Sequence, residues 1–168
     1  EALRCEAVGH HPLAIVQLAH ALQLLEPGDV LSRPERLLHA SLPLQDALRV
    51  VGCLRSSGAE KISFAGGEPT LLPYLGELLD YAKSIGFVTG VVTNGARLDA
   101  LLDAHGHAID WVALSIDSGD DAVQTALGRG RGGHLARVIA LADKCHAMGI
   151  RVKMNTVVTA LTWHEDMS

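Results

Sequence analysis

The order of apolar and polar residues divides this chain near residue 42. Beyond that point, short apolar runs typical of buried strands alternate with apolar stripes spaced three or four residues apart, which are typical of amphipathic helices. The predicted strands cover residues 61–65, 87–92, 111–116 and 150–158, and the predicted helices cover residues 44–56, 72–85, 98–102, 121–127 and 135–148. This alternation predicts a parallel sheet with helices outside it, arranged either as a closed or partial barrel or as an open doubly wound sheet.

The first 41 residues are harder to interpret. An apolar run begins at Pro12, extends to Leu25 and meets a turn signal, so we predict a helix over residues 12–25. Histidines are frequent here, but their spacing does not predict a metal site. We therefore expect residues 1–41 to be an unassigned, mainly helical region and residues 42–168 to form the main domain. Because the chain opens at Glu1 rather than Met, and residues 163–168 resemble the start of another helix, we expect a fragment at both ends.

The composition is that of a globular domain with an aliphatic core. Of the 168 residues, 48% are hydrophobic and only 4% are aromatic. A net charge of -5 gives no reason to expect nucleic acid as a partner. No apolar run is long enough to span a membrane, so we do not expect a membrane as a partner either. Cys5, Cys53 and Cys145 are too far apart for a disulfide framework or a zinc site, which favours a reducing, cytoplasmic location.

Small polar residues follow each predicted strand. The carboxyl ends of parallel strands form one edge of a sheet, where ligands bind, so a polar group at every strand end predicts a ligand site. The residues are Gly66, Gly67 and Glu68 after the first strand, Asn94 after the second, Ser115 and Asp117 at the third, and Asn155 on the fourth. The paired glycines allow a sharp turn and close approach of a ligand, and Glu68 is an acceptor suited to an ammonium group.

Two further features predict anion binding. Lys61 and Lys153 lie on strands, and a lysine directed into a barrel needs an anionic partner such as a polyphosphate. A lysine solvated at the rim is the alternative. Arg129 and Arg131 lie in the glycine-rich stretch 128–133, and arginine binds carboxylate or phosphate through two parallel hydrogen bonds. A flexible loop with exposed arginines is the alternative there.

Together these motifs resemble the radical S-adenosylmethionine (SAM) superfamily, and within it the viperin-like, nucleotide-modifying branch. The matching stretches are 60–71 (EKISFAGGEPTL), 91–95 (VVTNG), 114–118 (LSIDS), 128–132 (GRGRG), 153–157 (KMNTV) and 164–167 (HEDM). The GGEP motif is typical of the whole superfamily. The lysine before it, the GRG loop and the KxN strand indicate the viperin-like branch.

The resemblance implies a partial (β/α)6 TIM-like barrel, incomplete at both ends, and a role for each site residue. The SAM-binding residues would be Gly66, Gly67 and Glu68 at the amino group, with Asn94, Ser115 and Arg129 at the rest of the molecule. Arg129 is suited to the SAM carboxylate. The substrate-binding residues would be Lys61, Lys153 and Asn155, with the lysines at the triphosphate of a nucleotide.

The resemblance also implies a reaction. In such enzymes an electron donor reduces a [4Fe–4S] cluster, which cleaves SAM to a 5′-deoxyadenosyl radical that abstracts a ribose hydrogen from a nucleoside triphosphate. Loss of water then gives a 3′-deoxy-3′,4′-didehydro nucleotide that terminates viral transcripts. The family members are therefore lyases of antiviral defence.

One departure from the family concerns the cluster. Its C-x-x-x-C-x-x-C loop belongs shortly before residue 42, but residues 1–41 contain only Cys5. We therefore expect the first barrel strand and its loop to be missing or replaced, through a reading-frame error or genuine loss, and the chain as written to be inactive. The alternatives are another radical SAM enzyme, such as a peptide or cofactor maturase, and a cluster-less, non-catalytic protein that keeps the barrel.

Overall fold

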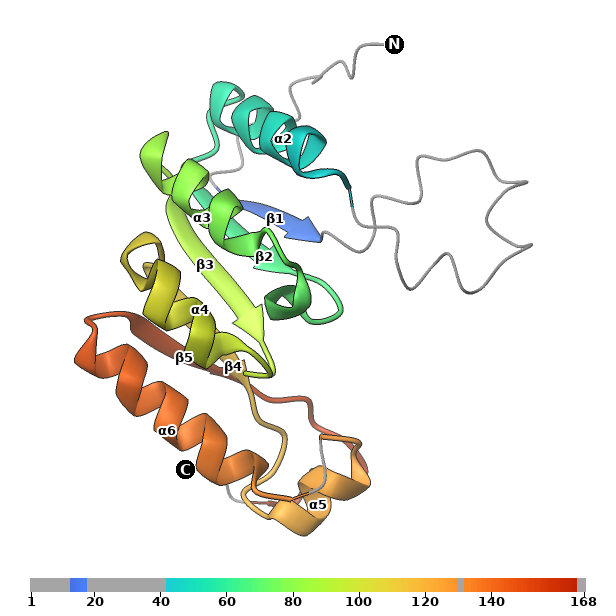
Figure 1. The fold of residues 1–168 in the computed structure, drawn as a ribbon. Helices are drawn as coiled ribbons and strands as arrows, with labels where there is room; N and C mark the ends of the chain where they lie inside the picture. Colours follow the sequence, from blue (N-terminus) through green and yellow to red (C-terminus); the bar gives the residue numbers. More distant parts are fainter. Residues whose placement is uncertain (1–12, 18–41, 130–131, 166–168) are drawn as a thin grey trace, which may run out of the picture.

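One parallel sheet forms the centre of the protein (Figure 1). The computed structural model describes residues 13–17, 42–129 and 132–165. The five strands are β1 (Leu13–Gln17), β2 (Lys61–Ala65), β3 (Val88–Thr93), β4 (Trp111–Ser115) and β5 (Arg151–Asn155). The α-helices are α2 (Leu44–Ser56), α3 (Leu75–Ser84), α4 (Leu98–His105), α5 (Asp121–Ala126) and α6 (His134–Ala147), with short 3-10 helices at Pro69–Leu71 and Gly106–Ala108.

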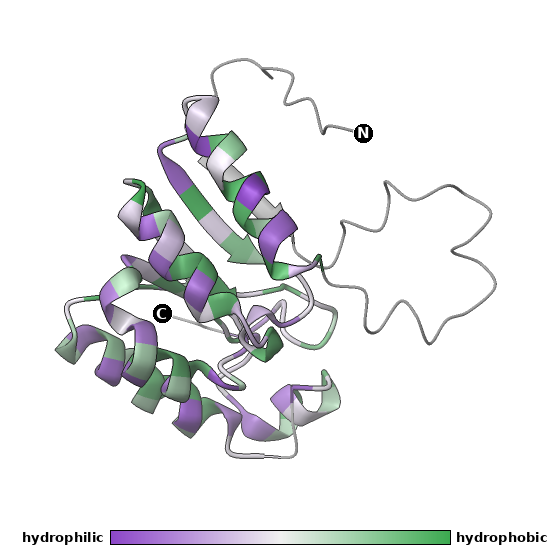
Figure 2. Cartoon of the chain, turned by 45° about the horizontal axis from the view of Figure 1, so that its top comes forward, coloured by the Kyte–Doolittle hydropathy of each residue, from purple (hydrophilic) through white to green (hydrophobic). Residues whose placement is uncertain are grey.

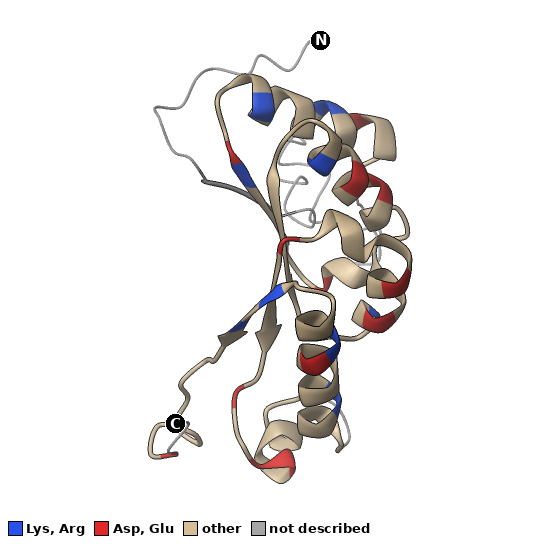
Figure 3. Ribbon diagram, turned by 90° about the vertical axis from the view of Figure 1, so that its left-hand side faces the viewer, with Lys and Arg blue, Asp and Glu red and all other residues tan. Residues whose placement is uncertain are grey.

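The strand order settles the choice between the two predicted architectures. The strands lie in the order β1-β2-β3-β4-β5, and every neighbouring pair is parallel. Right-handed connections that always advance in one direction place all the helices on the same face of the sheet. Figure 3 shows this arrangement from the edge, with the helices on one side of the strands. A doubly wound sheet reverses its order and has helices on both faces, so the fold is a partial TIM-like barrel.

The hydrophobic core fills the space between the strands and the helices. Alternate residues of β2, Ile62 and Phe64, are 0% exposed and point toward the helices. The same face of the sheet carries Val91 on β3 and Val112 and Leu114 on β4, all fully buried. Figure 2 shows that apolar and polar residues alternate along the helices. The predicted aliphatic core is therefore confirmed, because Leu, Val, Ile and Ala make up most of it.

The opposite side of the sheet has a different composition. Register places alternate residues of β2–β5 there, and we call this side the helix-free face because none of the described helices covers it. Its members are Lys61, Ser63, Ala65, Val88, Gly90, Val92, Trp111, Ala113, Ser115, Arg151, Lys153 and Asn155. Three of them are cations and none is an anion, so this face can attract a negatively charged ligand.

The structure corrects two predictions for the amino-terminal region. Leu13–Gln17 form a strand rather than part of a helix, and Leu13 pairs with Lys61 while Gln17 pairs with Ala65. A first strand is therefore present, which contradicts one of the two expected outcomes, a missing strand, and leaves a replaced strand as the other. A short apolar run has no period that separates a buried strand from a buried helix, and pairing with the free edge of β2 decided the outcome. The remainder of the predicted helix over residues 12–25 lies outside the described residues.

The other predicted elements are confirmed with small shifts in their ends. The second helix begins at Leu75 rather than residue 72, because a 3-10 turn at Pro69–Leu71 and then Pro73 precede it. The last strand ends at Asn155, before the predicted residue 158. Trp163 and His164 lie in turns rather than in the start of a helix, and residues 166–168 lie outside the description.

Candidate functional site

Glu68 joins the carboxyl ends of β2 and β3. Its Oε1 accepts hydrogen bonds from the backbone N–H of Thr70 (3.0 Å), the Thr70 hydroxyl (2.6 Å) and the Thr93 hydroxyl (2.5 Å). Its Oε2 accepts one from the backbone N–H of Asn94 (2.7 Å). The carboxylate therefore has a fixed orientation, held by groups on two neighbouring strand ends.

The acceptor capacity of Glu68 is incompletely used. A carboxylate has about four lone-pair sites, two on each oxygen. Three donors converge on Oε1, whereas Oε2 receives only the Asn94 N–H. Among the described residues, no Lys, Arg or His forms an ion pair with Glu68. Oε2 can therefore accept a further hydrogen bond, and a ligand ammonium group would supply both the donor and the missing positive charge.

The two glycines before Glu68 leave its surroundings open. Gly66 has φ of +139°, a conformation that residues with a side chain rarely adopt, so it permits the turn out of β2. A Cβ atom built at Gly67 would meet nothing within 4 Å, and both glycines are exposed. The backbone here is thus accessible to a ligand bound beside Glu68.

Asn94 uses one half of its amide locally. Its Oδ1 accepts the backbone N–H of Ala96 (2.9 Å) and thereby fixes the turn after β3. Its Nδ2 group forms no hydrogen bond with the described residues. Asn94 can therefore donate to a ligand next to Glu68 while its oxygen maintains the loop.

A second polar group lies where β4 and β5 end. Ser115 and Asn155 are register partners on the helix-free face. Two residues beyond Ser115, Asp117 accepts the Arg129 Nε–H at 2.6 Å and the backbone N–H of Val157 at 2.9 Å. The Asp117 side chain is only 6% exposed and that of Arg129 is 28% exposed. Arg129 is thus held through Nε, while its two terminal nitrogens can donate to an anion.

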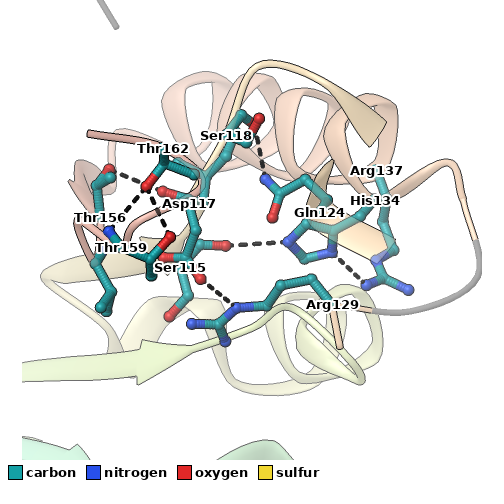
Figure 4. A network of polar contacts seen from close by, with 12 residues as sticks. Ser115, Asp117, Ser118, Gln124, Arg129, His134, Arg137, Thr156, Thr159 and Thr162 are labelled. Carbon is teal, nitrogen blue, oxygen red and sulfur yellow. Dashed lines mark hydrogen bonds and ion pairs between the residues drawn. The ribbon is translucent and has the colours of Figure 1, made fainter. Parts of the chain in front are cut away.

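Hydrogen bonds also support the loop that carries Arg129 (Figure 4). Gln124 donates to the backbone oxygen of Ser118 (2.8 Å), and a ring nitrogen of His134 lies 3.1 Å from the backbone oxygen of Ser115. Asp121 accepts the backbone N–H groups of Leu135 and Gly133, each at 3.0 Å. The bond from Leu135 is the main cause that lowers the pKa of Asp121. The glycine-rich stretch is therefore fixed at both ends; residues 130–131, including Arg131, lie outside the described residues.

The structure brings most of the predicted site residues together. Gly66, Gly67, Glu68 and Asn94 lie at one half of the carboxyl edge, and Ser115, Arg129 and Asn155 lie at the other half. Thr93 pairs with Leu114, so the two halves are adjacent. Lys153 shares the helix-free face with Ser115 and Asn155 and lies two residues before Asn155. Lys61 has the same face but lies at the amino end of β2, away from this edge.

The sequence placed Asp117 at a strand end but did not indicate that it orients Arg129. It also did not indicate that Thr70 and Thr93 orient Glu68. A signal existed for Thr93, because it is the last residue of a strand. Trp111 was treated only as a strand residue, yet the Lys153 ammonium nitrogen lies 5.4 Å from the centre of its ring.

The described cysteines do not fit an iron–sulfur cluster. Cys53 lies on α2, and Cys145 is fully buried on α6, where burial raises the pKa of its thiol. In the described part of the chain, no group of three His, Cys, Asp or Glu residues could hold a metal ion. Cys5 lies outside that part.

None of the described helices has the length and apolar character needed to cross a membrane.

Comparison with known proteins agrees with this geometry. An S-adenosylmethionine-dependent nucleotide dehydratase of a Thermoplasmatales archaeon (strain ISO4-H5) is 44% identical over 115 residues, which are 67% of this chain and 41% of that protein. A dehydratase of the same name from Lacinutrix mariniflava is 39% identical over 132 residues, 76% of this chain and 28% of that protein. The chain thus spans less than half the length of these relatives.

A solved structure supports the fold. The crystal structure of archaeal TYW1 has a TM-score of 0.50 and 23% identity, over 83% of this chain and 51% of that chain. The radical SAM superfamily matches residues 29–166, and the relatives named as nucleotide dehydratases confirm the resemblance to the viperin-like branch. From this match over most of its length, the chain belongs to the radical SAM superfamily.

Proposed function

We propose that this chain is the SAM- and nucleotide-binding core of a viperin-like nucleotide dehydratase that acts on a nucleoside triphosphate. The observation that carries the proposal is Glu68, an oriented carboxylate with an open acceptor position on Oε2 and no cation among its described partners. Such a group is suited to the amino group of SAM. The names of the relatives support both SAM and a nucleotide as ligands.

The neighbouring residues suit the remainder of SAM. Arg129 is oriented by Asp117 and keeps its terminal nitrogens for the SAM carboxylate. Asn94 would contribute its amide N–H, and Ser115 its hydroxyl, from the adjacent strand ends. In this family SAM supplies a 5′-deoxyadenosyl radical, and this chain would bind, orient and shield the reactants.

The nucleotide would lie along the helix-free face. Lys61 and Lys153 would bind its triphosphate and Asn155 would contact it near the SAM edge. Neither lysine forms a salt bridge with the described residues, so both charges are available to an anion.

Calorimetric titration of the protein with SAM and with nucleoside triphosphates tests the proposal. We expect Glu68→Gln to weaken SAM binding and leave nucleotide binding unchanged, and Lys153→Met to do the reverse. Asp143→Asn, an exposed change on α6, is the matched control. Equal SAM binding by wild type and Glu68→Gln would contradict the SAM assignment.

Iron analysis addresses the cluster separately. After anaerobic reconstitution with iron and sulfide, we expect less than one [4Fe–4S] cluster per chain, because three cysteine ligands do not come together. Under reducing conditions the chain is then expected to bind both ligands without cleaving SAM. A full cluster content with SAM cleavage would contradict this expectation.

A further inference from the structure

Trp111 lies on the helix-free face in a space that exists only because residue 90 is glycine. Trp111 and Gly90 are register partners on β4 and β3. A Cβ atom built at Gly90 would lie 2.1 Å from Cε2 and 2.5 Å from Nε1 of the indole. The ring therefore lies directly against the β3 backbone, and its position is fixed by this contact.

The Lys153 ammonium nitrogen lies 5.4 Å from the centre of the Trp111 ring. This distance is within the range of a cation–π interaction. No salt bridge within the described residues neutralises Lys153 or the other two cations of the helix-free face, Arg151 and Lys61. Lys153 thus contacts an aromatic face that stabilises its charge without supplying an anion.

The indole also determines where the charge of Lys153 is placed. The backbone of Lys153 pairs with Ala113, two residues beyond Trp111, whereas Lys61 pairs with Val88, two residues before Gly90. Each such step is about 7 Å along a strand. Along the strands toward their carboxyl ends, the level of Trp111 is therefore one such step beyond Lys61 and one such step before Lys153. By contacting the ring, the Lys153 ammonium group turns back toward the level of Lys61.

We propose that Trp111 is a positioning residue for the polyphosphate of the substrate. It holds the Lys153 ammonium group one strand step above Lys61, so that the two lysines converge on a single polyphosphate chain. Gly90 makes this possible by leaving room for the indole. The inference rests on the proposed function, which assigns Lys61 and Lys153 to the triphosphate.

Calorimetry with inorganic tripolyphosphate as the probe tests this role. We expect Trp111→Leu to weaken tripolyphosphate binding by about three- to thirtyfold, the range of a cation–π contact, and Trp111→Phe to weaken it by less than threefold. SAM binding is expected to stay unchanged in both variants. Lys153→Met is measured beside them, because it tests the phosphate assignment itself.

Fluorescence provides a second readout that does not require replacing Trp111. The other tryptophan, Trp163, is 71% exposed, and Trp163→Phe makes Trp111 the sole emitter. Tripolyphosphate should then change the emission of Trp111, and adding Lys153→Met should abolish that change. This readout depends on the Lys153–Trp111 contact rather than on stability.

The outcomes separate the two proposals. If Lys153→Met weakens tripolyphosphate binding but Trp111→Leu does not, the proposed role of Trp111 is wrong and the proposed function stands. The same conclusion follows if tripolyphosphate does not change the fluorescence of Trp111. If Lys153→Met binds tripolyphosphate as tightly as wild type, the phosphate assignment is wrong and the inference about Trp111 fails with it.

Discussion

The two ends of the sheet place carboxylates in opposite situations. At the amino end, Asp110 accepts from the Lys83 ammonium group at 2.6 Å and from the backbone N–H of Thr89 at 2.8 Å. At the carboxyl end, Glu68 accepts only from neutral N–H and O–H groups. The charge of Asp110 is balanced by Lys83, whereas the charge of Glu68 is balanced by no cation among the described residues.

The same contrast applies to the arginines. Arg55 donates to the backbone oxygens of Ile85 and Ala59, each at 3.0 Å, and its guanidinium lies 5.8 Å from the centre of the Phe87 ring. Arg129 donates through Nε to Asp117, and its terminal nitrogens form no hydrogen bond with the described residues. In parallel barrels the amino ends of the strands serve stability and the carboxyl ends serve function. For these two carboxylates and two arginines, the unused hydrogen-bonding capacity lies at the carboxyl end.

The largest expected effect is the loss of SAM affinity on replacing Glu68 at the carboxyl end of the sheet. Glu68→Gln removes the charge that would face the SAM ammonium group, and a charged hydrogen bond contributes about 1.5–3 kcal/mol. SAM affinity measured by calorimetry should therefore fall by about ten- to a hundredfold. The melting temperature should also fall, because the amide oxygen still accepts from Thr70 and Thr93 but the new NH2 group faces the backbone N–H of Asn94. Glu77→Gln, on the exposed side of α3, is the control and should change neither quantity.

The complementary change is at the amino end. Asp110→Asn replaces an acceptor oxygen with an NH2 group beside the Lys83 ammonium group or the Thr89 N–H, so the free energy of unfolding should fall by about 1–3 kcal/mol. SAM affinity should remain within twofold of wild type. Urea denaturation and calorimetry measure the two effects. A loss of SAM affinity as large as that of Glu68→Gln would remove the distinction between the two ends.

Acid should diminish the contribution of Asp110. Burial acts to raise the pKa of Asp110, but the hydrogen bonds from Lys83 and Thr89 outweigh it and hold the pKa below its ordinary value of 3.8. As pH falls below 3.8, the unfolded chain binds a proton before the folded one, so the stabilisation is lost toward the lower, folded pKa. The stability difference between wild type and Asp110→Asn should thus be constant from pH 7 to 5 and shrink toward pH 3. A difference that grows with acid would contradict this sign.

The smallest effect on the free energy of unfolding is expected for a surface ion pair that lies away from both ends of the sheet. Arg49 and Asp46 form an ion pair on α2 with 79% and 43% of their side chains exposed. Arg49→Ala should change the free energy of unfolding by less than about 0.5 kcal/mol, since water and salt screen such pairs. Urea denaturation of this variant sets the baseline against which Asp110→Asn is judged.

The carboxyl edge of the sheet was predictable from the sequence because its signals are local. Gly66 and Asn94 directly follow strands, Glu68 lies three residues after one, and the topology of parallel sheets brings strand ends together. The ion pair between Asp117 and Arg129 could not be predicted from local sequence signals, because twelve positions and a helix separate the partners. Sequence spacing does not fix how such a loop folds back.

Two features depended on register and could not be predicted. The contact of Trp111 with Gly90 and Lys153 needs the offsets among three strands, which no single stretch encodes. The strand Leu13–Gln17 needs the free edge of β2, and its apolar run alone equally suits a helix. In both cases the deciding partner lies far along the chain.

The pairing of β1 with β2 has a consequence for the order in which the sheet assembles. Lys61 pairs with Leu13 across a longer stretch of chain than separates any other neighbouring strands of the described sheet. Closing so long a loop costs the most chain entropy and slows folding. β2, β3 and β4, which pair across shorter stretches, should acquire hydrogen-exchange protection before β1. The edge that carries Glu68 and Asn94 would then form while the first strand is still unpaired.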